Sequence, residues 1–207
     1  ELEDPLNGGK KNFDGTVLDG QFTTLSFDGL NYLPNARGDL VKTFGVTLCY
    51  DYSSEATTAI CIADDVANAI TSEESQRICE ISGVKDPKNS AGPVQISDLK
   101  QLPQGNDKIS IIFTVSQVDP AVKIYKVGSE NGCSTNLDNT DKGKVHLTVN
   151  LPEQSQANID CLGAFTSSGK IAEGEVTLFD GNPYTVTCTI EGNTGSDIIY
   201  EDGVPSK

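Results

Sequence analysis

Strict alternation of apolar and polar residues in the second half of the chain is the feature that most constrains its fold. In residues 108–118 the apolar side chains Ile109, Ile111, Phe113 and Val115 recur at every second position. A period of two places such side chains on one face of a β-strand, whereas a helix needs a period of 3.6. The alternation therefore predicts strands.

The same pattern recurs in short stretches separated by turn-forming residues. We expect strands in residues 94–99, 108–118, 121–127, 144–151 and 157–165, and a hairpin between residues 174–179 and 184–190. In the last strand Tyr184, Val186, Cys188 and Ile190 share one face. Short strands at this spacing are typical of a β-sandwich. The predicted fold class is all-β.

The first half of the chain has a weaker pattern. Residues 21–33 are rich in β-forming residues, residues 64–81 have weak helical character, and the Gly, Pro, Asn and Ser residues of 82–93 predict a linker. We therefore expect three parts: an extended N-terminal segment (1–30), a cysteine-stapled hairpin with a short helical or loop region (31–90), and a sandwich domain (91–207).

Two cysteines lie symmetrically in the stretch GVTLCYDYSSEATTAICI, residues 45–62. Folding this stretch about Glu55 pairs Leu48 with Ile62 and Tyr50 with Ile60, and it places Cys49 opposite Cys61. Cross-strand Cβ atoms lie about 4.5 to 5.5 Å apart, close to the roughly 3.5 to 4.5 Å of a disulfide. The symmetry predicts a Cys49–Cys61 staple.

The other four cysteines complete a disulfide framework. Cys161 and Cys188 both face the predicted core, where they are able to join, and elimination then leaves Cys79 with Cys133. None of the six cysteines forms a C-x-x-C pair, so a disulfide framework is expected rather than a metal or redox site. We expect an oxidising, extracellular or cell-surface location; six buried thiols in a cytosolic protein is the alternative.

Charge and motif content exclude several function classes. Thirty acidic against 15 basic residues give a net charge of −15, which disfavours nucleic acid and anionic membrane surfaces. There is no apolar run long enough to insert into a membrane. His146, the one histidine, alternates with Val145 and Leu147 and is expected to point outward.

No catalytic residue, metal ligand or cofactor is predicted. The chain lacks a nucleophile elbow, a phosphate-binding loop, a zinc-protease motif and a dinucleotide loop. The acidic stretches 63–65 and 138–143 do not fit calcium-loop spacing and are interpreted as solvated turns. A pair of carboxylates of the glycosidase type stays open as an alternative, although no particular pair stands out. We expect no enzyme activity.

The cysteine-framed stretch resembles a family of secreted, immunoglobulin-like proteins of small-genome (DPANN-type) archaea. The matching positions are Cys49, Tyr50, Tyr52, Ala56, Thr57, Cys61, Ile62, Cys79, Gly92, Pro93 and Val94. The resemblance covers roughly residues 40 to 190 and implies an immunoglobulin-like β-sandwich. In that family the hairpin closes a complete upstream domain, and the downstream domain has its own closing strand. Here few strands precede the hairpin, and no long apolar strand follows Ile190.

These departures predict an incomplete sandwich that is closed by a strand from a neighbouring subunit. The preferred donor is residues 13–30, with apolar side chains Val17, Leu18, Phe22, Leu25 and Phe27; the hairpin is the second candidate. The resulting hypothesis is a subunit of an extracellular, pilus-like filament, a homopolymer built head-to-tail by donor-strand complementation. The alternative is a monomeric cell-surface adhesin or carbohydrate-binding module, with another cell surface as its partner.

Overall fold

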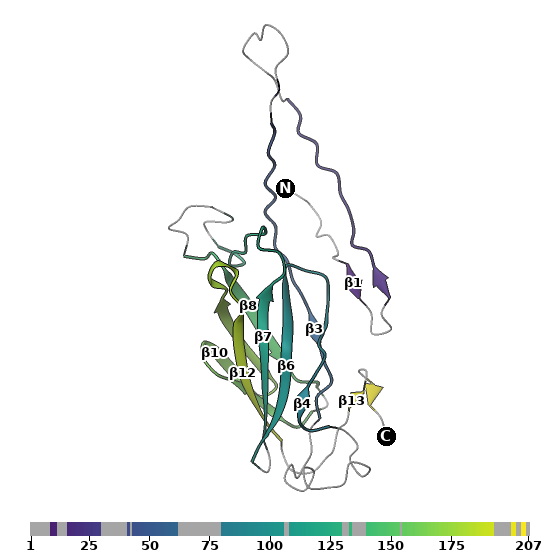
Figure 1. The fold of residues 1–207 in the computed structure, drawn as a ribbon, viewed down its shortest axis with the longest axis vertical. Coiled ribbons are helices and arrows are strands. Elements are labelled where there is room, and N and C mark those ends of the chain that lie inside the picture. The colour runs from purple at the N-terminus through teal and green to yellow at the C-terminus, as the bar shows by residue number, and fades with distance from the viewer. Residues whose placement is uncertain are drawn as a thin grey trace.

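The chain folds into antiparallel β-sheets. The computed structural model describes residues 9–11, 16–29, 41, 43–61, 80–105, 108–129, 133, 140–153, 155–192, 200–201 and 204–205. Within these ranges the regular elements are strands and one short 3₁₀ turn, with no α-helix. The predicted all-β class is confirmed. Figure 1 shows the longer strands gathered into one body, from which a long extended segment projects.

The strands differ widely in length. Five of the strands that enclose the core are β6 (Val94–Gln104), β7 (Lys108–Gln117), β8 (Lys144–Asn150), β11 (Ile171–Thr177) and β12 (Tyr184–Glu191). The shorter ones are β1 (Lys10–Lys11), β2 (Val17–Leu18), β3 (Ala56–Thr57), β4 (Gly83–Val84), β5 (Lys88–Asn89), β9 (Asn158–Cys161), β10 (Phe165–Ser168), β13 (Tyr200–Glu201) and β14 (Val204–Pro205). The turn η2 spans Phe179–Gly181.

The larger sheet has five strands in the order β4-β6-β7-β12-β9. β6 and β7 form a hairpin that passes through Gly105, whose φ of +76° suits glycine. A bulge interrupts β6 between Ser97 and Lys100, where Asp98 has a φ of +51°. The extra residue moves the inward-facing positions of β6 onto Leu99 and Gln101, so both halves of the strand face the core.

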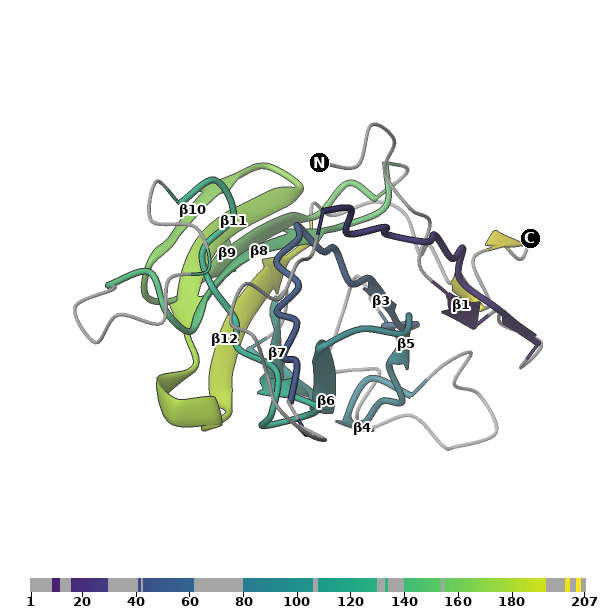
Figure 2. The same cartoon turned by 90° about the horizontal axis from the view of Figure 1, so that it is seen from above.

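The smaller sheet has three strands in the order β10-β11-β8. Seen from above in Figure 2, it lies across from β12, β7 and β6. β12 pairs with β7 over its whole length and not with β11. The predicted hairpin between residues 174–179 and 184–190 is therefore wrong: both strands form, but η2 takes the chain from one sheet to the other. Alternation determines which face of a strand is buried, and it does not determine the strand's partner.

Both sheets contribute to one hydrophobic core. On the larger sheet its buried side chains include Ile109, Ile111, Phe113, Val115, Val186, Cys188 and Ile190, the alternating positions of β7 and β12 that the sequence predicts. On the smaller sheet Ala172 and Val176 are buried as fully. Burying one large aliphatic side chain contributes about 1.5 to 3 kcal/mol. The strands β7 and β12, which carry most of these side chains, are therefore central to stability.

Cys161 and Cys188 form a disulfide, as the sequence analysis expects, with their Cα atoms 3.9 Å apart. They lie directly opposite each other on the neighbouring strands β9 and β12, so the bridge is within one sheet. The next pair is hydrogen-bonded, because the Leu162 N–H donates to the Thr187 carbonyl. The two cysteines therefore occupy a non-hydrogen-bonded position, where cross-strand side chains are closest.

The predicted hairpin of residues 45–62 does not form. Residues 43–55 are extended without strand pairing, and β3 pairs with β5 instead, through Ala56↔Asn89 and Thr57↔Lys88. Tyr50 is exposed while Ile60 packs against the core, so the two are not partners. The Cys49–Cys61 staple is consequently wrong.

Three other predicted segments differ from the structure or lie outside it. Residues 82–93 contain β4 and β5, and β4 joins the larger sheet beside β6. Residues 121–127 form no strand and make a single bridge, Tyr125↔Lys142. The weak helical prediction for 64–81 falls almost entirely outside the described residues, as does Cys79.

Candidate assembly site

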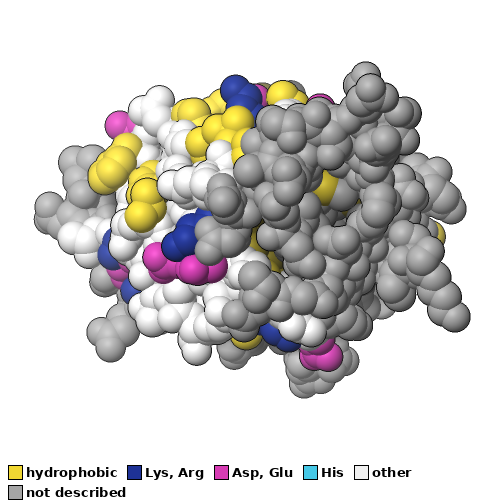
Figure 3. Space-filling model, turned by 90° about the horizontal axis from the view of Figure 1, so that it is seen from below, with side chains coloured by type: hydrophobic (Ala, Val, Ile, Leu, Met, Phe, Trp, Pro, Cys, Tyr) yellow, Lys and Arg dark blue, Asp and Glu magenta, His cyan; other side chains and the backbone are white. Residues whose placement is uncertain are grey.

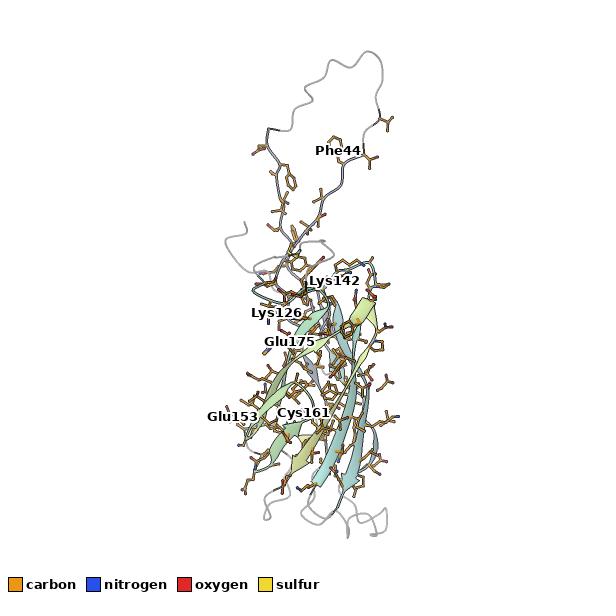
Figure 4. All side chains as sticks on the ribbon, turned by 90° about the vertical axis from the view of Figure 1, so that its left-hand side faces the viewer. Phe44, Lys126, Lys142, Glu153, Cys161 and Glu175 are labelled. Carbon is orange, nitrogen blue, oxygen red and sulfur yellow. A yellow bond between two sulfur atoms is a disulfide. The ribbon has the colours of Figure 1, made fainter. Side chains whose placement is uncertain are left out.

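An extended arm projects from one end of the β-body. We define the arm as two limbs, residues 16–29 and residues 43–52. Figure 1 shows them as long extended segments that reach beyond the sheets. Phe44 lies far out on the second limb (Figure 4). Among the described residues, no backbone hydrogen bond joins residues 22–29 or 43–51 to another segment. Residues 22–29 and 43–51 are thus extended like strands but pair with no other described segment, whereas β2 at the start of the first limb pairs with β1.

The arm exposes its large apolar side chains. In the second limb Phe44, Val46, Leu48, Tyr50 and Tyr52 follow a strict period of two, and Phe44 is 82% exposed. Four of the five predicted donor side chains lie exposed on the first limb, namely Leu18, Phe22, Leu25 and Phe27. The fifth, Val17, lies in β2, and its side chain is outside the described part. A row of exposed, large apolar side chains on a protein surface indicates an interaction site.

A disulfide holds the second limb at Cys49, which we call the root of the arm. Cys49 is bonded to Cys133, 84 residues later in the sequence, with 5.9 Å between their Cα atoms. This pairing also makes the expected Cys79–Cys133 bridge wrong. Cys61 is disulfide-bonded as well, to a partner outside the described residues. The spacing of Cys49 and Cys61 gave no sign of a partner in a distant loop.

Three hydrogen bonds hold the chain where the second limb enters the body. The Tyr52 hydroxyl donates to the Ala91 carbonyl at 2.6 Å. The Glu55 N–H donates to Ser90 Oγ at 2.9 Å, and the Ser90 N–H donates back to the Glu55 carbonyl at 2.7 Å. The chain from Cys49 to Glu55 is therefore fixed to the body. Within the second limb, residues 43–48 are the part that projects away from the body.

An ion-pair cluster joins Lys126 and Asp141, which precede β8, to side chains of β8 and β11. Lys126 Nζ lies 2.9 Å from a Glu175 carboxylate oxygen, and Lys144 Nζ lies 3.4 Å from Glu175 and from Asp141. Figure 4 places Lys126 and Glu175 at the end of the sheets from which the arm emerges. The Lys126 hydrogen bond lowers the pKa of Glu175, and the Ser129 hydroxyl lowers the pKa of Asp141.

Burial of the core declines toward one side. On the smaller sheet Ala172 is 0% exposed, while its cross-strand partner Val149 is only partly buried. On the larger sheet Val115 is 0% exposed, while its partner Ile96 is only partly buried. We call this the open side of the core. Its inward-facing, partly exposed side chains are Val94, Ile96, Val145, Leu147 and Val149.

The outer edge of β6 is sealed from within the chain. Asn89 Oδ1 accepts from the Ile96 N–H at 2.8 Å, and Asn89 Nδ2 donates to the Ile96 carbonyl at 2.9 Å. Farther along, β4 pairs with Lys100 and Gln101. An amide side chain thus takes the place of a strand where β4 does not reach, which protects the edge from pairing with other chains.

A depression lined mostly by polar side chains lies at the end of the body opposite the arm. Gln104, Lys108, Asn158, Ile159, Asp160, Thr189 and Glu191 line this shallow depression. A Lys108–Glu191 ion pair of 3.1 Å lies at its margin. Figure 3 views this end and shows small, separate apolar and charged groups of described side chains. The depression contains no nucleophile paired with a base.

The remaining candidate groups within the described residues are not arranged as a catalytic or metal site. His146 is exposed on β8, pointing outward as its alternation predicts. Within the described ranges, no three His, Cys, Asp or Glu side chains come together as a metal site. The same ranges contain no helix of the length and apolar character that a membrane span requires.

Comparison with known proteins gives no relative. No family model matches the chain, and no curated protein or solved structure is significantly similar to it.

Proposed function

We propose that this protein is the structural subunit of an extracellular, pilus-like filament that polymerises head-to-tail by donor-strand complementation. In this arrangement the body is an immunoglobulin-like β-sandwich that lacks one strand, and the arm of a neighbouring copy supplies it. The observation that supports the proposal is the presence of two complementary features on one chain. One is the exposed apolar stripe of the arm, of which residues 22–29 and 43–51 have no strand partner within the described residues; the other is the open side of the core, where inward-facing side chains of β6 and β8 are only partly buried.

The energetics favour such an exchange. Each large apolar side chain that moves from water into the open side contributes about 1.5 to 3 kcal/mol. Strand addition also gives hydrogen-bond partners to the backbone of the arm. Because donor and acceptor lie on different parts of the same chain, the contact is heterologous, and repetition of such a contact builds a filament unless the rotation closes a ring.

The disulfides suit this role. The Cys49–Cys133 bridge fastens the arm to its own body, and the Cys161–Cys188 bridge fastens two strands of the larger sheet. Bridges of this kind persist in oxidising, extracellular surroundings. Together they would resist extraction of an arm or a strand when a filament is pulled.

The test is a full-length variant in which the arm side chains Phe22, Leu25, Phe27, Phe44, Val46 and Leu48 are changed to serine. These side chains are exposed in the subunit, so the variant is expected to fold and to stay monomeric, while the native chain forms filaments visible by negative-stain electron microscopy. The matched control changes exposed apolar residues outside the arm, Val84, Leu162 and Phe179, to serine, and it should still polymerise.

Two results would overturn the proposal. One is a native chain that stays monomeric at every concentration, which would favour the monomeric adhesin instead. The other is a serine variant that polymerises as well as the native chain.

A further inference from the structure

β8 has an unsealed edge beside the open side of the core. β8 lies at the border of the smaller sheet, and among the described strands it pairs only with β11. Just before β8, the Gly143 N–H donates to the Ile124 carbonyl, and the Lys126 N–H donates to the Asp141 carbonyl. Along Lys144–Asn150 itself, no described segment continues this pairing. A strand added along β8 would continue the pairing that Ile124 and Lys126 begin at Asp141 and Gly143.

The register of β8 shows which backbone groups face this edge. The Leu151 N–H donates to the Lys170 carbonyl, so odd-numbered residues of β8 direct their backbone groups toward β11. The N–H and C=O groups of His146 and Thr148 consequently point to the open edge. The neighbouring side chains Val145, Leu147 and Val149 point to the core and are partly exposed.

The second limb of the arm matches this edge in period and length. Its free segment presents Phe44, Val46 and Leu48 at every second position, against three inward-facing side chains of β8 at the same spacing. Six residues of a strand, 43–48, span roughly 20 Å at about 3.3 Å per residue, and β8 is only one residue longer. The first limb fits less well, because Phe22 and Leu25 are three residues apart and would point to opposite faces.

We infer that the edge of β8 is the acceptor, and that residues 43–48 of a second copy of this chain are the donor strand. This inference rests on the proposed function and identifies the two surfaces that meet. In the joined state Phe44, Val46 and Leu48 enter the open side of the core beside Val145, Leu147 and Val149. The Gly45 and Thr47 side of the donor faces solvent. The acceptor is assigned to a second copy because the limb that carries Phe44 projects away from its own body (Figure 4).

Two limb variants of the full chain test the donor. Changing Phe44, Val46 and Leu48 to serine should abolish polymerisation, and changing Phe22, Leu25 and Phe27 to serine should leave it in place. The opposite pattern would overturn the donor assignment while leaving strand exchange itself standing. If neither variant lost polymerisation, both the donor assignment and the role of the arm would be wrong.

A peptide tests the acceptor. The probe is a synthetic peptide of residues 41–48, added to the full-length variant with serine at 44, 46 and 48. Hydrogen exchange should slow at least tenfold at the amides of His146 and Thr148 and change little in β12. A peptide with Val46→Asp is the control and should give no protection. Protection elsewhere, or none with the native peptide, would overturn the assignment of β8.

A variant of β8 separates strand addition from simple apolar contact. Thr148→Pro removes one N–H from the open edge, a position where a strand tolerates proline, and it should prevent peptide binding. Thr148→Ser keeps that N–H and should bind as before. If β8 is already protected in the monomer without peptide, independent of concentration, the arm occupies its own body and the second-copy assignment fails.

Discussion

Cys49 and Cys133 are bonded across 84 residues of sequence, so the root of the arm is tied to the loop in front of β8. A bridge that closes a loop of this length restricts the unfolded chain strongly. The donor limb and the edge that we propose as acceptor thus begin at one point of the molecule.

Removing this bridge should lower stability. The double variant Cys49→Ser/Cys133→Ser is expected to lose about 2 to 4 kcal/mol in the free energy of unfolding, measured by denaturant titration. Residues near Cys49 should also become more sensitive to limited proteolysis. An unchanged free energy of unfolding would mean that other contacts already hold the arm root.

Gln101 should be necessary for the segment that ends at Cys61. Its side chain is 0% exposed; Nε2 donates to the Cys61 carbonyl at 2.5 Å, and Oε1 accepts from the Cys61 N–H at 3.0 Å. Gln101→Leu removes both of these buried hydrogen bonds, at about 1 to 3 kcal/mol each. Denaturant titration should show this loss. The control Gln104→Leu, at an exposed position of the same strand, should change stability by less than about 0.5 kcal/mol.

Gly143→Ala should destabilise the loop in front of β8. Gly143 has a φ of +78°, and an added Cβ would lie 2.5 Å from the Leu178 carbonyl oxygen. The control is Gly128→Ala, where φ is +70° and no atom lies within 4 Å of the added Cβ. The left-handed backbone costs both variants about 1 to 2 kcal/mol of stability. Gly143→Ala also has the clash with Leu178, so its melting temperature should fall clearly further than that of Gly128→Ala. Equal losses would contradict the close packing of Gly143 against Leu178.

The pH dependence of stability should reflect Glu175. Its pKa is lowered in the folded state, chiefly by the Lys126 hydrogen bond, so its contribution is present above the unfolded pKa and is lost as the pH falls through the folded pKa. The melting temperature of the native chain should therefore fall in acid more steeply than that of Glu175→Gln. Glu173→Gln, an exposed position on the same strand, should behave like the native chain. If the melting temperatures of Glu175→Gln and the native chain fell equally with pH, the ion pair of Glu175 would not contribute to stability.

The sequence predicted the strands with strict alternation and missed their partners. The buried face of β12 is Val186, Cys188 and Ile190 as expected, because burial of one face imposes a period of two. The same period of two runs through the stripe from Phe44 to Tyr52. It could not show that this stripe is unpaired, since periodicity reports which side chains share a face and not where the partner strand comes from.

Long-range pairing explains the other errors. The symmetry of Cys49 and Cys61 suggested a local bridge, whereas the partner of Cys49 lies in a polar loop with no distinguishing pattern. Residues 82–93 had a linker composition, yet Asn89 seals the edge of β6 through its side chain. The open side of the core was not visible in the sequence, because Val145 and Val149 have the same alternation as fully buried residues.

Electron microscopy of the purified full-length chain over a range of concentrations tests strand exchange most directly. We predict filaments of uniform width that persist in detergent, and their loss when Phe44, Val46 and Leu48 are changed to serine. A native chain that remains a monomer at millimolar concentration, with the amides of β8 unprotected from hydrogen exchange, would contradict strand exchange between copies.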